Sequence, residues 1–96
     1  MLTSKNRAKL RGLANTMESI LQVGKGGVGA PLVTQVNDAL EARELIKLTV
    51  LETCPDPARD VAAQLAGDTD AEVVQVIGRK VTLYRRNAKK PVITLD

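Results

Sequence analysis

The sequence predicts an α/β fold, a two-layer sandwich in which helices pack against a four-stranded mixed sheet. Helical and strand-like apolar patterns alternate along the chain in the order α-β-α-β-α-β-β. The length of 96 residues suits one small domain, which buries about 60 to 65 per cent of its unfolded surface. Because no repeat, low-complexity tract or linker interrupts the chain, we expect a single domain over residues 1–96.

The first half of the chain is predicted to form two helices separated by a strand. Thr3 and Ser4 can cap a first helix over residues 5–14, whose apolar residues fall on one face. Residues 20–23 form a short apolar run that is typical of a strand. A second helix is expected over residues 32–42, where apolar residues recur at helical spacing.

The middle of the chain is predicted to contain a strand and a third helix. Residues 45–51 alternate between apolar and polar side chains, which favours a strand. Asp56 is a suitable N-cap for the helix and Pro57 a suitable first helical residue. The apolar stripe that follows ends at Gly67, which is expected to stop the helix.

The last part of the chain is predicted to form a hairpin. Residues 73–77 and 81–85 are expected to be strands, and Gly78 can supply a positive φ if the turn between them needs one. Residues 91–95 alternate weakly, so residues 87–96 are expected to be an edge strand or a flexible tail. The order of the strands does not follow from the sequence, although the second and third helices can share a face only if that order skips a strand.

Composition excludes several classes of function. The chain has no histidine and a single cysteine, Cys54, so it lacks the residues for a histidine-based or cysteine-rich metal site and for an internal disulfide. Glu52 and Asp56 lie beside Cys54 and would oppose formation of a thiolate. No apolar run approaches the roughly 20 residues of a membrane span, and residues 1–25 lack the apolar centre of a signal peptide. We therefore expect a cytoplasmic protein that is not an enzyme, with no metal, cofactor, small-molecule substrate or membrane contact.

Charge is distributed unevenly along the chain. Residues 1–25 carry five basic side chains and one acidic (+4), residues 26–78 three basic and nine acidic (−6), and residues 79–96 six basic and one acidic (+5). The formal net charge of +3 therefore hides two basic ends around an acidic middle. This distribution favours a strongly negative partner, above all nucleic acid, that touches both chain ends and the glycine-rich residues 24–29 if the fold brings them together.

Residues 24–29, Gly-Lys-Gly-Gly-Val-Gly, lie between a predicted strand and a predicted helix, where glycine backbone and helix amides can hold phosphate. Three interpretations arise: a dinucleotide fingerprint, a variant Walker A loop, and a G-x-x-G loop of the kind that clamps RNA. The first is disfavoured because Glu44 precedes the next strand and the chain is too short for the dinucleotide fold. The second lacks the required lysine and hydroxyl residue, since Ala30 and Pro31 stand at those positions.

Five blocks of sequence give the third interpretation a context. In chain order they are Leu10-Arg11-Gly12-Leu13-Ala14, Gly24-Lys25-Gly26-Gly27, Glu44-Leu45-Ile46-Lys47, Val74-Gln75-Val76-Ile77-Gly78-Arg79 and Leu83-Tyr84-Arg85. In this order the blocks resemble the CRM domain, named for chloroplast RNA splicing and ribosome maturation, in its stand-alone bacterial YhbY-type form. The resemblance covers about residues 2–86, nearly the whole chain.

The resemblance implies a fold similar to the C-terminal domain of bacterial translation initiation factor three. It also implies RNA binding through the G-x-x-G loop and association with precursors of the large ribosomal subunit. The chain departs from the family pattern at Asn15 and Arg43, where members often have histidine, and at Glu18-Ser19, where they often have proline. These departures remove any contact that depends on histidine and leave the RNA-binding face compatible with the family.

We expect contacts mainly to phosphate and ribose, because Tyr84 is the only aromatic residue and is expected to be a half-buried sheet residue rather than a platform for stacked bases. The candidate RNA-binding residues are those of the loop, the first helix and the C-terminal hairpin: Gly24, Lys25, Gly26, Gly27, Lys5, Arg7, Lys9, Arg11, Arg79, Lys80, Arg85 and Arg86. The basic residues of the first helix could instead be only its solvent-exposed side. Lys47 could pair with Glu44 or Glu52 and is therefore not included.

The sequence thus leads to the hypothesis of a monomeric, non-enzymatic protein that holds ribosomal RNA of the large-subunit precursor during assembly. Three alternatives stay open. A protein-interaction module would use the acidic middle or an exposed sheet edge. A general RNA-binding regulator would have no ribosomal role, and a nucleotide hydrolase would show turnover with magnesium.

Overall fold

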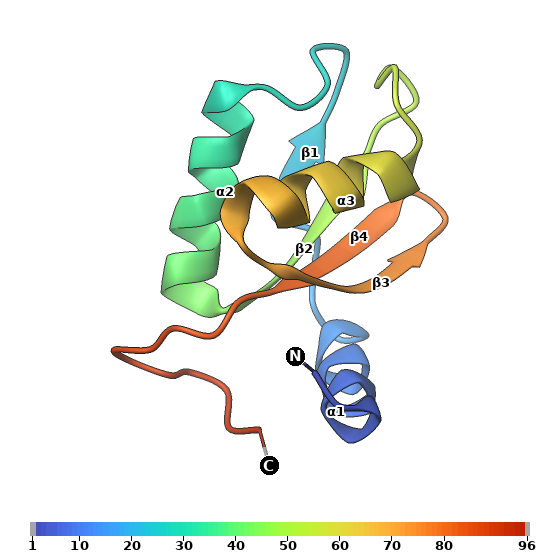
Figure 1. The fold of residues 1–96 in the computed structure, drawn as a ribbon. Coiled ribbons are helices and arrows are strands. Elements are labelled where there is room, and N and C mark those ends of the chain that lie inside the picture. Colours follow the sequence, from blue (N-terminus) through green and yellow to red (C-terminus); the bar gives the residue numbers. More distant parts are fainter. Residues whose placement is uncertain (1, 96) are drawn as a thin grey trace.

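The computed structural model describes residues 2–95 and contains three helices and four strands in the predicted order (Figure 1). These elements are α1 (Ser4–Ala14), β1 (Leu21–Val23), α2 (Ala30–Arg43), β2 (Leu45–Val50), α3 (Ala58–Thr69), β3 (Glu72–Ile77) and β4 (Lys80–Tyr84). Thr3 caps α1, because its hydroxyl accepts a hydrogen bond of 3.0 Å from the Asn6 backbone N–H. Within residues 2–95, no helix is both long enough and apolar enough to cross a bilayer.

The four strands form the predicted mixed sheet, in the order β1-β2-β4-β3. β1 runs parallel to β2, whereas β4 lies between β2 and β3 and is antiparallel to both. β3 and β4 form the predicted hairpin, and Gly78 in its turn has a φ of 59°. The two parallel crossovers, from β1 to β2 and from β2 to β3, step in the same direction across the sheet. Right-handed connections therefore place α2 and α3 on one face, where they contact each other, and the skipped β4 position is not what decides this (Figure 1).

The main hydrophobic core lies between the sheet and the helices α2 and α3. Alternate residues of β2, namely Ile46, Leu48 and Val50, point into it, as the sequence pattern predicts. Leu40 of α2 and Leu65 of α3 meet them and are fully buried. Each such leucine contributes about 1.5 to 3 kcal/mol through removal of its side chain from water, so burial on this face stabilises the packing of α2 and α3 on the sheet.

The opposite face of the sheet is covered by α1, at the end where β2 begins and β4 ends (Figure 1). Leu10 and Ala14 of α1 are buried against Leu45, Val74 and Tyr84. The predicted sandwich of helices and sheet is therefore present, and α1 adds a further layer over part of its second face.

α3 begins and ends later than the sequence predicts. Pro57 is the N-cap rather than the first helical residue, and Asp56 lies outside the helix. Gly67 does not stop α3, which continues to Thr69 and ends at Asp70, a residue in the left-handed conformation with a φ of 56°. The extension buries Thr69, whose hydroxyl donates a 2.6 Å hydrogen bond to the carbonyl one turn earlier, so tertiary packing outweighs the low helix propensity of glycine.

The closing residues 91–95 form no strand and lie against α1 instead. Ile93 and Leu95 pack onto the cluster around Leu10 and Tyr84. The ammonium group of Lys9 donates a hydrogen bond to the Thr94 carbonyl. The two ends of the chain are thus held together on one face of the sheet.

Glu44, at the end of α2, fixes the C-terminal segment. Its fully buried carboxylate accepts hydrogen bonds from the backbone N–H groups of Asn87 (2.6 Å), Val92 (2.7 Å) and Ile93 (2.6 Å). Burial alone would raise the pKa of Glu44, but these three hydrogen bonds and the charge of Arg86 lower the pKa below its usual value. Glu44 also has a φ of 64°, a conformation that costs a non-glycine residue about 1 to 3 kcal/mol and persists only where the surroundings enforce it.

Candidate nucleic-acid interface

The glycine loop, residues 24–29, joins β1 to α2 at one end of the sheet, which we call the loop end (Figure 1). The Gly24 carbonyl accepts a 2.9 Å hydrogen bond from the Gly27 N–H, and this bond closes a tight turn with Lys25 and Gly26 at its tip. Gly27 has a φ of 64°, in the left-handed region that favours glycine. The glycines therefore set a turn that presents Lys25 and Gly26 to solvent.

The two sides of this loop differ. Around Gly26 the space is open, because no atom lies within 4 Å of the position that a Cβ would occupy. Gly27 faces the loop between β2 and α3, with Pro55 Cγ at 3.6 Å and Asp56 Oδ2 at 3.8 Å from the corresponding position. A phosphate can approach the backbone on the Gly26 side, whereas the Asp56 carboxylate disfavours an anion on the Gly27 side.

The open side of the loop carries positive charge from two sources. The ammonium group of Lys25 forms no hydrogen bond or ion pair within residues 2–95. In addition, α2 begins after Gly29 without a side-chain cap. Since Pro31 has no N–H, Ala30 and Leu32 carry the amide groups of the first turn, where the helix has its partial positive charge.

The hairpin turn between β3 and β4 lies at the same end. The Val50 N–H donates a 2.7 Å hydrogen bond to the Arg79 carbonyl, which ties the turn to the end of β2. The Arg79 guanidinium lies 3.5 Å from the Glu52 carboxylate in an exposed ion pair, a kind of pair that contributes little to stability and can exchange for a phosphate. Lys80 is exposed at the start of β4. The loop end therefore gathers the predicted residues Lys25, Arg79 and Lys80.

Sequence reasoning missed Arg59, a further basic residue at the loop end. Arg59 is exposed in the first turn of α3, directly after the loop that contacts Gly27. Arg59 lies within the acidic segment 26–78, so the charge distribution along the sequence did not indicate it as a binding residue. The topology indicates it, because helices that follow parallel strands begin at the same edge of a sheet. The start of α3 is therefore expected at the same end as the start of α2.

The predicted basic residues of α1, together with residues 85–90, lie at the opposite end of the sheet, which we call the α1 end (Figure 1). The six residues of β2 separate the two ends, and a strand of that length spans about 20 Å. The fold thus brings α1 and residues 85–90 to one end of the sheet but holds the glycine loop, with Arg79 and Lys80, at the other end. The basic residues of the two chain ends are therefore divided between the two ends of the sheet and do not form one surface with the glycine loop.

Some basic groups of α1 hold the fold together. Arg7 Nη1 donates a 2.7 Å hydrogen bond to the Val73 carbonyl, and its second terminal nitrogen lies 3.6 Å from a carboxylate of β3. Lys9 binds the C-terminal segment, as described above. Lys5 and Arg11 are exposed to solvent. The uniform sign of these charges therefore does not reflect one shared role: Arg7 and Lys9 are bonded within the fold, whereas Arg11 forms no hydrogen bond or ion pair with the described residues.

Arg85 and Arg86 are neighbours with different environments. Arg85 Nη1 donates hydrogen bonds of 2.7 Å to the Asn37 side-chain oxygen and to the Thr69 carbonyl, which join the end of β4 to α2 and α3. Arg86 is exposed and forms no hydrogen bond or ion pair with the described residues. Of the two arginines, Arg86 is the one with a guanidinium available to a ligand.

Lys47 does not pair with Glu44 or Glu52, the two partners considered from the sequence. Its ammonium group donates hydrogen bonds to the carbonyls of Ala14 (3.0 Å) and Met17 (3.4 Å), at and just beyond the end of α1. The Ala14 carbonyl also accepts a 3.0 Å hydrogen bond from the Met17 N–H, so Lys47 adds a second donor there and complements the negative end of the helix dipole.

Tyr84 is a sheet residue, as predicted, and is more buried than expected, with 4% of its surface exposed. Burial and the negative charge of Glu44 raise the pKa of its phenol, so the hydroxyl is protonated at neutral pH. Tyr84 therefore offers no exposed ring face on which a base could stack.

The described part of the chain shows no group of three or more His, Cys, Asp or Glu side chains that could hold a metal ion. Cys54 is half-buried in the loop between β2 and α3 and packs against the main core. This placement is the ordinary structural role expected for a single cysteine.

Residues 2–85 match the model of the CRS1 / YhbY (CRM) domain. The Bacillus subtilis (strain 168) protein named "Probable RNA-binding protein YqeI" is 42% identical over 95 residues, which cover 99% of each chain. A Haemophilus influenzae protein named "RNA-binding protein" is 29% identical and aligns with 88% of this chain and 85% of its own length. The solution structure of the hypothetical protein SAV1595 from Staphylococcus aureus has a TM-score of 0.83 and 41% identity, over the full length of both chains.

Proposed function

The chain belongs to the CRS1 / YhbY (CRM) domain family, and on that basis we propose that it binds RNA, with the G-x-x-G loop as the site that holds the RNA backbone. The names of the Bacillus subtilis and Haemophilus influenzae relatives support RNA as the partner. The geometry of the loop end supports the site.

The observation that carries the proposal is the open side of the glycine turn. Lys25 and Gly26 stand at the tip, Lys25 has no partner within residues 2–95, and the space at Gly26 is empty. A phosphate there would meet glycine backbone, an unpaired ammonium group and the uncapped start of α2. Arg79, Lys80 and Arg59 would extend the contact to neighbouring phosphates along the same end.

The RNA in this proposal is ribosomal RNA of the large-subunit precursor, bound in the cytoplasm by a monomer that holds the RNA during assembly without catalysing a reaction. The resemblance to the YhbY-type form of the domain is the support for this narrower statement. Crosslinking in cells followed by sequencing of the bound RNA tests it. We expect large-subunit precursor sequences, and enrichment of unrelated messenger RNA would instead favour a general regulator.

Charge reversal at the turn tests the RNA site. We expect Lys25→Glu combined with Gly26→Asp to abolish binding of a structured RNA, because both changes place negative charge where the phosphate would lie. Gly26 tolerates the change sterically, since its surroundings are open and its φ is not positive. The control is Arg43→Glu combined with Ala42→Asp, which makes the same change of charge on exposed residues at the far end of α2.

Binding is measured over a salt series. Wild-type affinity should fall steeply as salt rises, with a slope of about −0.7 to −0.9 per phosphate contact on a double-logarithmic plot. The control should keep most of that affinity and slope. Equal binding by the loop variant and the wild type would contradict the site, and co-purification of a protein partner that survives complete nuclease digestion would favour a protein-interaction module.

A further inference from the structure

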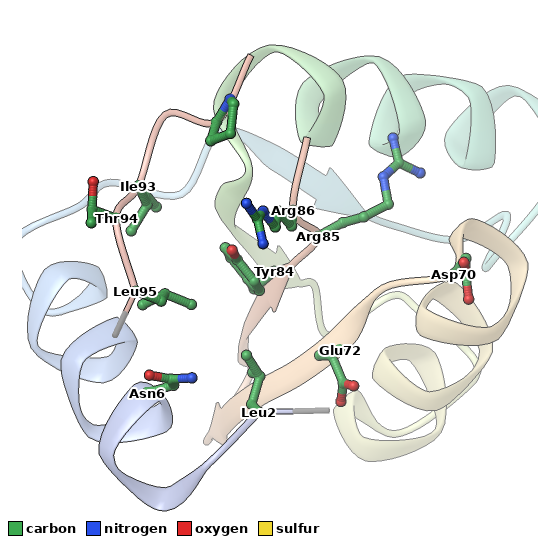
Figure 2. Close-up of a pocket in the computed structure, with 11 residues that line it drawn as sticks. Leu2, Asn6, Asp70, Glu72, Tyr84, Arg85, Arg86, Ile93, Thr94 and Leu95 are labelled. Carbon is green, nitrogen blue, oxygen red and sulfur yellow. The ribbon is translucent and has the colours of Figure 1, made fainter. Parts of the chain in front are cut away.

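A pocket of about 600 Å³ opens at the α1 end, between α1, the C-terminal segment and the neighbouring ends of β3 and β4 (Figure 2). Leu2, Ile93 and Leu95 give it apolar walls, while Asn6, Glu72 and Arg86 bring polar groups to it. A volume in the range of about 300 to 1,000 Å³ with apolar walls and a few polar groups is typical of a small-ligand site. The pocket is separate from the glycine loop, which lies at the other end of the sheet.

The hydroxyl of Tyr84 is the unusual group in this pocket. Although the residue is 4% exposed, its hydroxyl forms no hydrogen bond with any residue in the described part of the chain. No described polar side-chain atom is sealed from solvent without a partner, so the hydroxyl retains contact with solvent. Tyr84 lines this pocket, and Figure 2 shows its hydroxyl end close to Arg86, another lining residue. Buried tyrosine hydroxyls usually have a partner, and this one leaves a position for a hydrogen bond to a ligand.

Arg86 supplies the charge at the same place. Figure 2 shows Arg86 close to the hydroxyl end of Tyr84, whereas the side chain of Arg85 turns away toward α2. Because Arg86 is exposed and has no ion pair within residues 2–95, its guanidinium can form paired hydrogen bonds with a phosphate.

The remaining walls restrict what can occupy the pocket. Glu72 and Asp70 place carboxylates on the side formed by β3 and the end of α3, so a run of phosphates would be repelled there. The carboxylate oxygens of Asp70, and the Glu72 oxygen that the 3.6 Å ion pair with Arg7 leaves open, can accept hydrogen bonds from amino and imino groups such as those on base edges. A single planar base, enclosed by leucine and isoleucine and attached to one phosphate near Arg86, matches this distribution of charge.

We propose that the pocket holds one unpaired nucleotide of the bound RNA, with its base against Leu2, Ile93 and Leu95, a base-edge hydrogen bond to Tyr84, and its phosphate on Arg86. The inference rests on the proposed RNA binding and adds a second contact at the α1 end. The loop would hold paired backbone, and the pocket would select RNA that carries a flipped-out nucleotide.

The test compares a paired RNA duplex with the same duplex carrying a single-nucleotide bulge, with each of the four bases in turn. The wild type should bind at least one bulged RNA about tenfold more tightly than the paired duplex, as expected for the burial of one base. Arg86→Gln and Tyr84→Phe should reduce this preference while leaving affinity for the paired duplex nearly unchanged. Arg43→Gln, which removes an exposed charge outside the pocket, is the matched control and should keep the preference.

A second readout reports on the pocket without a substitution. Since Tyr84 is the only aromatic residue, the aromatic NMR signals of carbon-13-labelled protein come from this ring alone. They should shift on addition of the bulged RNA and stay in place with the paired duplex.

Equal affinity for the two RNAs, with Tyr84 signals that do not move, would contradict nucleotide binding in the pocket. RNA binding by the glycine loop would be unaffected by that result. A preference that persists in both Arg86→Gln and Tyr84→Phe would overturn it as well. No binding to either RNA would overturn the proposed function and, with it, this ligand.

Discussion

At the loop end Lys25 stands on an exposed turn with no partner within residues 2–95, while at the α1 end Arg7, Lys9 and Arg85 are hydrogen-bonded to backbone carbonyls. Both ends carry several basic side chains. At the α1 end Arg7 and Lys9 join α1 to the sheet and to the C-terminal segment, and Arg85 joins β4 to α2 and α3. At the loop end the charge of Lys25 makes no contact within residues 2–95.

The sign of a charge therefore does not reveal its role. A basic residue whose donors are satisfied inside the protein must lose those bonds before it can contact phosphate, so its replacement is expected to affect stability first. A basic residue on an open turn has no such hydrogen bonds to lose when it contacts phosphate, so its replacement is expected to affect RNA affinity first. The two ends should therefore separate in experiments that measure stability and RNA affinity side by side.

The largest loss of stability is expected from Glu44→Ala. The change leaves three backbone N–H groups of the C-terminal segment without their acceptor and should lower the free energy of unfolding by about 3 kcal/mol. Urea unfolding measures the loss, and hydrogen exchange at Val92 and Ile93 should become fast. Slow exchange at both amides in the variant would contradict the role of Glu44 in fixing this segment.

Acid should weaken the α1 end through the same carboxylate. The pKa of Glu44 in the folded protein lies below its usual value of 4.5, so the carboxylate contributes stability that is present above about pH 4.5 and is lost as the pH falls through the folded pKa. Unfolding measured between neutral and acid pH should show this decline. Glu44→Gln should flatten it, and an unchanged decline in that variant would assign the effect to other groups.

Arg85→Ala should give an intermediate loss of stability. It removes hydrogen bonds to Asn37 and Thr69 that join β4 to both helices of the main layer, at a cost of about 2 kcal/mol. Affinity for a paired RNA duplex should change little as long as the variant is folded. A large loss of RNA affinity without loss of stability would indicate that Arg85 contacts RNA rather than stabilising the fold.

The smallest effects should lie within the glycine turn and should differ between neighbours. Gly27→Ala places a Cβ on a residue with a φ of 64° and should cost about 1 kcal/mol. Gly26→Ala meets open space and should change stability by less than about 0.5 kcal/mol. Thermal unfolding of the two variants provides the comparison, and equal costs would show that the turn differs from the one described.

The sequence predicted the order of elements, the hairpin and the mixed sheet, because these follow from local periodicity and from residues such as Gly78. It could not predict that β4 lies between β2 and β3, since strand order depends on contacts between segments far apart in the chain. The end of α3 was also missed, because the stop expected at Gly67 is overridden by the burial of Thr69.

The candidate site was predictable to a similar extent. The glycine turn and Lys25 could be identified from the sequence because the glycines themselves determine the conformation. The different roles of the basic residues could not be predicted from the sequence. Arg85 and Arg86 are adjacent, yet Arg85 is bonded within the fold and Arg86 forms no hydrogen bond or ion pair within residues 2–95. Tyr84 was expected only as a sheet residue, and the pocket beside it forms from segments that meet only in the folded chain.

The most direct test of the difference between the two ends is an NMR map of backbone amide signals during addition of a paired RNA duplex. The largest shifts should fall on residues 24–32, with smaller shifts at Arg79 and Lys80. Signals of Arg7, Lys9 and Arg85 should move little, because their side chains stay bonded within the fold. Large shifts at these three residues with unchanged signals in the glycine loop would contradict RNA binding at the loop end.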